Sequence, residues 1–84
     1  MIINNNEDIL RFSKELIIKM NSIGEHAFAK ELENWSGGFY TTSSEFLGEF
    51  KMILERVKGL KPLDLSTKKD IIDCIEIINK AFCT

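Results

Sequence analysis

The chain has 84 residues, of which 44% are apolar and 29% are charged, and its formal net charge is −2. A chain of this length forms one hydrophobic core, because cores divide only in chains several times longer. We therefore expect a single domain over residues 1–84. The aliphatic content and the small net charge exclude a disordered chain, and a pI near 5.4 argues against nucleic-acid binding, which needs clustered cations.

The first eight residues, MIINNNED, contain neither a basic stretch nor an apolar one, so we expect no secretory signal. The longest aliphatic run, residues 16–18, is far short of the roughly 20 residues that span a bilayer. These features predict a cytoplasmic protein with no membrane partner, whose two cysteines, Cys74 and Cys83, are reduced. The two lie on opposite sides of any helix that holds both, which excludes a bridge within that helix.

Apolar residues recur at helical spacing near the N-terminus and predict a helix from about residue 5 to about residue 21. Three asparagines, Asn4 to Asn6, are suitable N-caps, and two acidic residues follow them at the positive end of the helix dipole. The predicted core face of this helix consists of Ile9, Phe12, Leu16, Ile17 and Met20.

The boundary between the first and second helices has two interpretations. Ser22 and Glu25 have the spacing of a capping box, which would begin the second helix at Ser22. Alternatively, Gly24 is the left-handed residue that ends the first helix. In either case a tight corner follows, and the pair Gly37-Gly38 ends the second helix because glycine permits positive φ. The predicted core face of the second helix consists of Ala27, Phe28, Leu32 and Trp35.

Residues 39–41 are predicted to form a loop, because no second strand is available to pair with them. The third helix begins at the capping box of Thr42 and Glu45, and Gly59 is expected to end it as a left-handed residue. Gly48 lies within this helix, where glycine is unfavourable, so we expect a close crossing with another helix there. The predicted core face consists of Phe46, Leu47, Phe50, Ile53, Leu54 and Val57.

A fourth helix is expected to begin near Ser66 or Thr67. Four amphipathic helices with short connections predict an all-α fold, a compact bundle of about four antiparallel helices. The predicted core face of the fourth helix consists of Ile71, Cys74, Ile75, Ile78 and Phe82, with Ile72 widening it.

The sequence offers few groups for catalysis. His26 is the single histidine, and together with the two cysteines it forms no zinc-binding motif. A nucleophilic pair of His26 with a thiol would require the fold to bring the two together. No glycine-rich phosphate loop is present. We therefore expect no enzymatic activity, no metal and no cofactor.

Charge is unevenly distributed along the chain. Residues 25–49 contain five glutamates against Lys30, a balance of −4, and residues 51–69 contain six cations against two acids, a balance of +4. The acidic segment also contains three aromatic residues around a Ser-Gly-Gly turn, and tryptophan and tyrosine are favoured as interface anchors. The alternative interpretation is ordinary solvation, with the rings covering one end of the core. The candidate partner-binding residues are Glu31, Glu33, Trp35, Phe39, Tyr40, Glu45 and Glu49.

Two stretches, GEHAFAKEL at residues 24–32 and TSSEFLGE at residues 42–49, resemble small all-helical bacterial immunity proteins of contact-dependent growth inhibition and related toxin–immunity systems. The resemblance implies a cytosolic protein that binds one toxin domain, often a cationic nuclease, and blocks its active site. The leading hypothesis is thus a non-enzymatic inhibitor with a basic protein partner. The alternative hypothesis is a helical adaptor or regulatory subunit that self-associates through apolar residues.

Overall fold

A computed structural model describes residues 6–82, and the side chains of residues 6–80. Over these residues the chain forms four α-helices and no β-strand, which confirms the all-α prediction. The first helix has the predicted extent, whereas Asn4, Asn5 and Cys83 lie outside the described residues. The helices are α1 (Asn6–Ser22), α2 (His26–Ser36), α3 (Ser43–Val57) and α4 (Leu65–Phe82).

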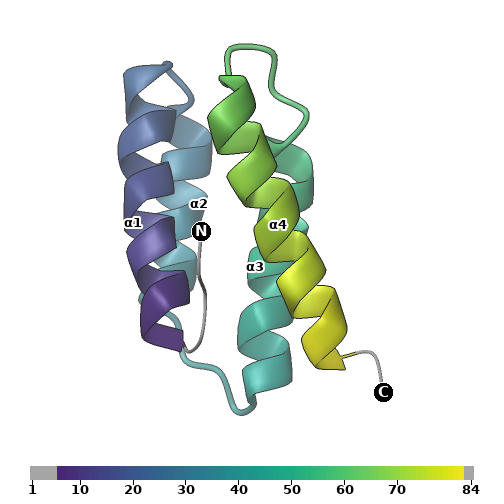
Figure 1. The fold of residues 1–84 in the computed structure, drawn as a ribbon. Coiled ribbons are helices and arrows are strands. Elements are labelled where there is room, and N and C mark those ends of the chain that lie inside the picture. Colours follow the sequence, from purple (N-terminus) through teal and green to yellow (C-terminus); the bar gives the residue numbers. More distant parts are fainter. Residues whose placement is uncertain (1–5, 83–84) are drawn as a thin grey trace. The chain divides into compact units, whose positions relative to one another are not determined.

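The described residues divide into two compact units, one over residues 6–39 and the other over residues 40–82. The first unit contains α1 and α2, and the second contains α3 and α4. In each unit the two helices pack against each other in antiparallel orientation (Figure 1). The single domain predicted from chain length stays a prediction, and the structural units within the chain are two helical hairpins.

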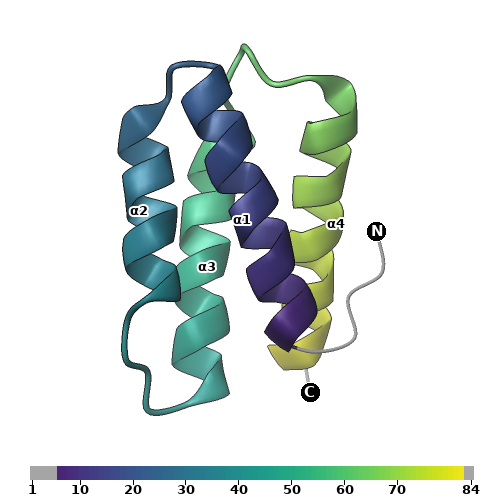
Figure 2. The same ribbon diagram turned by 90° about the vertical axis from the view of Figure 1, so that its left-hand side faces the viewer.

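The α1–α2 hairpin, whose two helices are joined by a short turn (Figure 2), buries one apolar face of each helix. In α1 the predicted face is confirmed except for Ile17, which is half-buried. In α2 the prediction of Ala27 is wrong, because Ala27 is exposed and Ala29 is buried instead. Phe28 is half-buried. The buried apolar residues of this unit are Ile9, Phe12, Leu16, Met20, Ala29, Leu32 and Trp35.

Gly24 ends α1, which decides between the two interpretations of this corner. It has a φ of +83°, in the left-handed region that favours glycine. Its N–H donates to the carbonyl of Asn21 at 3.3 Å, and the Glu25 N–H donates to the carbonyl of Met20 at 2.8 Å. These two bonds form a Schellman motif, which satisfies carbonyls that the helix end leaves unpaired. Ser22 is therefore the last residue of α1 rather than the cap of α2.

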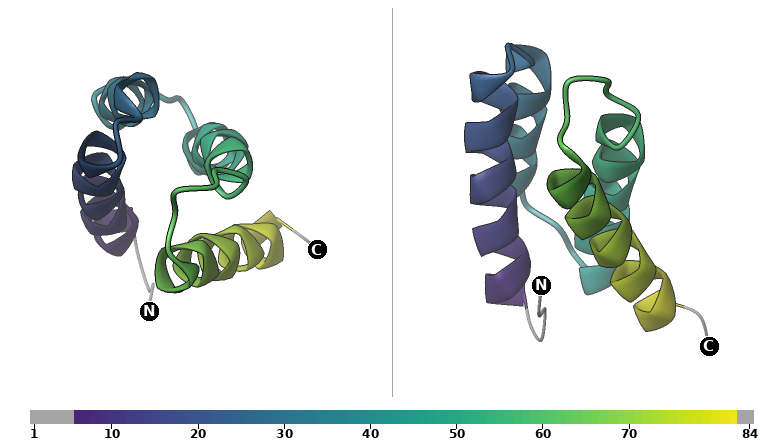
Figure 3. Two further views of the ribbon diagram at one scale, coloured as in Figure 1. Left: turned by 90° about the horizontal axis from the view of Figure 1, so that it is seen from above. Right: turned by 45° about the horizontal axis from the view of Figure 1, so that its top comes forward.

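The α3–α4 hairpin is joined by the loop of residues 58–64, and α4 is inclined to α3 (Figure 3). Helix α4 begins at Leu65, slightly earlier than predicted. Two predicted core residues of this unit, Phe46 and Leu47, are only half-buried, and Ile72 is 46% exposed. The side chain of Phe82 lies outside the described residues. The buried apolar residues are Phe50, Ile53, Leu54, Val57, Leu63, Ile71, Cys74, Ile75 and Ile78.

Helix α3 begins with the predicted cap, but only half of the predicted capping box forms. The Thr42 hydroxyl accepts a hydrogen bond from the Glu45 N–H at 3.2 Å. The Glu45 carboxylate bonds to Thr41 rather than to the Thr42 N–H, accepting from the Thr41 N–H at 3.3 Å and from its hydroxyl at 3.0 Å. The carboxylate thereby fixes the segment that leads into α3.

The pair Gly37-Gly38 ends α2 as predicted, since the helix stops at Ser36, but neither glycine has a positive φ. Gly59 follows the end of α3 and also lacks the predicted positive φ. The prediction of a close helix crossing at Gly48 is wrong, because a Cβ built on Gly48 meets no atom within 4 Å. Space for a methyl group exists there, so packing does not require the glycine.

Candidate protein-binding surface

The predicted partner-binding residues belong to both units. Four of them, Glu31, Glu33, Trp35 and Phe39, are in the α1–α2 unit. Trp35 is only 3% exposed, so its ring belongs to the core, in accord with the structural alternative. Phe39 has the opposite environment, since it lies beyond the end of α2 and is fully exposed. Phe39 is therefore the aromatic residue of this unit that is accessible to a partner.

The other three residues lie around the start of α3, and we call Tyr40, Glu45 and Glu49 the acidic corner. Glu45 and Glu49 are exposed and Tyr40 is half-buried. The Tyr40 ring packs edge-on against the ring of Phe46, with centroids 5.5 Å apart and planes at 72°. This geometry is favourable for aromatic pairs, and it holds the phenol near the surface. The structure thus brings these three side chains together in one unit.

Tyr40 and Glu49 are close enough to interact electrostatically. The pKa of Tyr40 is raised above its ordinary value, first by burial and second by the negative charge of Glu49. Both effects disfavour the phenolate, because burial removes water from the charge and a nearby carboxylate repels it. Tyr40 therefore presents a neutral hydroxyl, which can donate a hydrogen bond to a partner.

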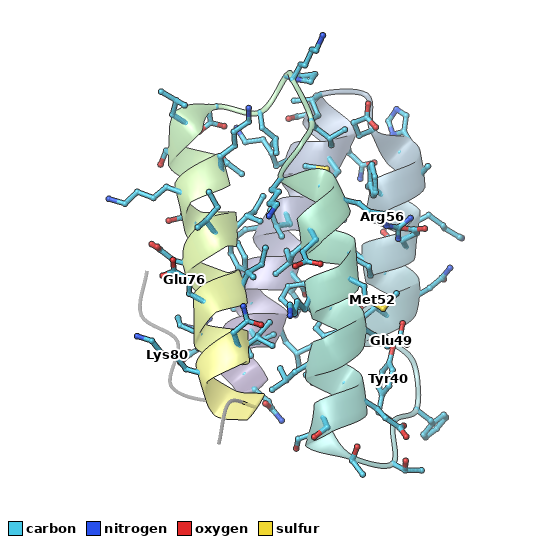
Figure 4. The ribbon with its side chains drawn as sticks, turned by 90° about the vertical axis from the view of Figure 1, so that its right-hand side faces the viewer. Tyr40, Glu49, Met52, Arg56, Glu76 and Lys80 are labelled. Atoms are coloured by element: carbon cyan, nitrogen blue, oxygen red, sulfur yellow. The ribbon has the colours of Figure 1, made fainter. Side chains whose placement is uncertain are left out.

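The acidic corner continues along α3 in a row of exposed side chains. Figure 4 shows Glu49, Met52 and Arg56 following one another along the helix, with Tyr40 before the first of them. Met52 is 62% exposed. It lies outside the predicted core face of α3, and that position is the signal that could have identified it as a surface residue. We call Glu49, Met52 and Arg56 the α3 row.

Most of the basic segment of the sequence lies at the other end of this hairpin. Arg56 is in the last turn of α3, where a cation stabilises the negative end of the helix dipole, and Lys58 follows it. Lys68 and Lys69 lie near the start of α4, where a cation is unfavourable. Favourable interaction with a helix dipole therefore explains the positions of only some of the cations in residues 51–69. The unit carries its negative and positive charge at different places along α3 and α4.

The residues considered for catalysis occupy ordinary environments. His26 is exposed, and its Nδ1 lies 2.9 Å from Oδ1 of Asn21. Cys74 is buried as a free thiol, and burial raises its pKa to about 12, which keeps it protonated. Among the described residues no group of three or more His, Cys, Asp or Glu side chains could hold a metal ion.

None of the helices over residues 6–82 is long and apolar enough to cross a membrane. Comparison of the chain with protein-family models finds no matching family, and comparisons with curated proteins and with solved structures find no match.

Proposed function

We propose that this chain is a non-enzymatic protein-binding inhibitor that covers a basic partner with its acidic corner. The observation that carries the proposal is the juxtaposition of Glu49 with Tyr40 at an exposed site of the α3–α4 unit. The Glu49 carboxylate can pair with a cation, and the neutral phenol beside it can donate a hydrogen bond at the same place. Phe39 directly precedes Tyr40 in the chain, and its fully exposed ring is a separate apolar side chain that a partner can contact.

The more specific form of the proposal is an immunity protein that neutralises a bacterial toxin domain. It rests on the resemblance of residues 24–32 and 42–49, the second of which contains Glu45 and Glu49. A nuclease that binds nucleic acid carries a cationic active site. A compact acidic surface is complementary to such a site and would exclude the substrate from it.

The experiment begins with the gene immediately upstream. If it encodes a secreted protein with a variable C-terminal domain, that domain is expressed in a bacterial host with and without this chain. We expect the domain alone to stop growth and co-expression of the chain to restore it. The two proteins should also co-purify.

Charge reversal at the acidic corner then tests the surface. Glu49→Lys is expected to weaken the complex at least tenfold, whereas the matched control Glu15→Lys on α1 leaves it unchanged. Tyr40→Phe and Phe39→Ala test the hydroxyl and the ring. Full protection by all three folded variants would contradict the proposed surface, and an upstream operon of metabolic enzymes would contradict the immunity role.

A further inference from the structure

The α3 row is complementary to itself. Glu49, Met52 and Arg56 are spaced at i, i+3 and i+7, which places them on one side of the helix, as Figure 4 shows. The order along the row is an acid, an exposed apolar side chain and a base. When such a row is turned end for end, the acid takes the position of the base, and the apolar residue stays near the middle.

We propose that α3 docks against α3 of a second copy of this chain in antiparallel orientation, around a two-fold axis at Met52. In this arrangement Glu49 of each copy faces Arg56 of the other copy, and the two Met52 side chains meet. A two-fold contact uses the same surface on both subunits, so each favourable pair occurs twice. The inference goes beyond the proposed function and does not depend on it.

The exposure of the three side chains and their spacing along α3 fit this contact. All three side chains are exposed, and Met52 is 62% exposed although it is apolar and flexible. Methionine adapts its shape to an opposing surface, which suits a position at the symmetry axis. Glu49 and Arg56 are about 10 Å apart along the helix, at 1.5 Å per residue, and Met52 lies close to their midpoint.

The charge of the unit favours association of two copies. Over residues 40–80 the acids and the bases are equal in number, seven of each, so this unit is neutral although the whole chain is not. Two neutral units with separated charge attract in antiparallel orientation and lack the net repulsion that keeps highly charged proteins apart. A contact centred on one helix face is small, so we expect a weak dimer.

Charge-reversal variants test the proposal with the chain alone, by sedimentation velocity and equilibrium up to about 1 mM protein, near the weak end of measurable affinities. Wild-type protein should show a monomer–dimer equilibrium that weakens with added salt. Glu49→Arg and Arg56→Glu each oppose like charges across the axis, and each should lower the association constant at least about tenfold. Glu15→Arg, the same charge change on α1, should leave it unchanged.

Two restorations distinguish this contact from any other. The double variant Glu49→Arg/Arg56→Glu reverses the order of charges but keeps it self-complementary, so it should dimerise again. An equimolar mixture of the two single variants should form a heterodimer, since one carries two cations in the row and the other carries two anions. If Arg56→Glu does not fold by circular dichroism, Met52→Lys, which places two cations at the axis, should abolish the dimer.

A monomeric wild type at every concentration would overturn the proposal. Dimerisation that persists in the single variants or in Met52→Lys would overturn it too. So would a failure of both the double variant and the mixture of single variants to dimerise again. Because no toxin domain enters these measurements, their failure leaves the inhibitor proposal standing, and failure of toxin neutralisation leaves the dimer standing.

Discussion

The carboxylate of Glu45 accepts hydrogen bonds from both the backbone N–H and the hydroxyl of Thr41. It reaches one residue further back than a capping box requires, while the Thr42 hydroxyl caps the helix by accepting from the Glu45 N–H. The start of α3 is thus fixed by two consecutive threonines with different roles. The same carboxylate belongs to the acidic corner, so the surface proposed to bind a partner includes a side chain that also orders the start of α3.

Thr42→Ala is expected to lower the free energy of unfolding by about 1 kcal/mol, since it removes the acceptor that caps α3. Urea denaturation followed by circular dichroism measures the change. Ser44→Ala is the matched control, because Ser44 is an exposed residue of the same helix, and it should change stability by less than about 0.5 kcal/mol. Equal losses in both variants would contradict the assignment of the cap.

Gly48→Ala should stabilise the protein, by up to about 1 kcal/mol, because alanine is the better helix former and the added methyl group meets no neighbouring atom. Gly24→Ala should act in the opposite sense. An L-residue in the left-handed region costs about 1–2 kcal/mol, and Gly24 has positive φ. Thermal and urea unfolding of the two variants compare one substitution in two backbone conformations. If Gly48→Ala instead lowers stability, that result would support the prediction that another helix crosses closely at Gly48.

Tyr40 is the single tyrosine, so absorbance near the phenolate band reports its titration alone. The midpoint is expected above 10, the ordinary pKa of tyrosine, because burial and Glu49 both disfavour the phenolate. Glu49→Gln should lower the midpoint by removing the carboxylate charge. The pKa should remain above its ordinary value, since burial is the larger cause. An unchanged midpoint in Glu49→Gln would show that the two side chains do not interact.

Cys74 makes stability depend on pH in the alkaline range. Burial raises its pKa to about 12 from the ordinary 9.0, so the unfolded chain loses the thiol proton at a lower pH than the folded protein does. The stabilisation is therefore complete below about pH 9 and declines as the pH rises towards about 12. Urea unfolding of Cys83→Ser protein, with and without Cys74→Ala, measures it. The stability difference between the two proteins should become smaller as the pH rises.

Periodicity predicted the four helices and most of their buried faces, because the burial of an apolar stripe dominates helix placement. It failed where the decision rests on local geometry. Ala27 and Ala29 are equally apolar and lie on either side of the stripe formed by Phe28, Leu32 and Trp35, and packing against α1 buries Ala29 and leaves Ala27 exposed. Ser22 and Gly24 each carry a valid boundary signal, and the left-handed backbone of Gly24 decides between them.

The candidate surface was predicted in part. The acidic corner follows from the clustering of glutamates and aromatic residues, but composition could not separate a buried Trp35 from a fully exposed Phe39 four residues later. That difference arises from the end of α2 at Ser36, because Trp35 lies within the helix, on its buried face, and Phe39 lies beyond it. Met52 is apolar, but it lies outside the apolar stripe that faces the core, so its exposure follows from its position on the helix and not from its residue type.

The complete exposure of Phe39 also makes the connection between the hairpins a target for proteolysis. Chymotrypsin-like enzymes cleave after large aromatic residues, and they need several residues outside regular structure in order to bind. Residues 37–42 provide such a segment between α2 and α3, with Phe39 and Tyr40 at its centre. One cut after Phe39 would sever the covalent link between the two hairpins and leave every helix whole.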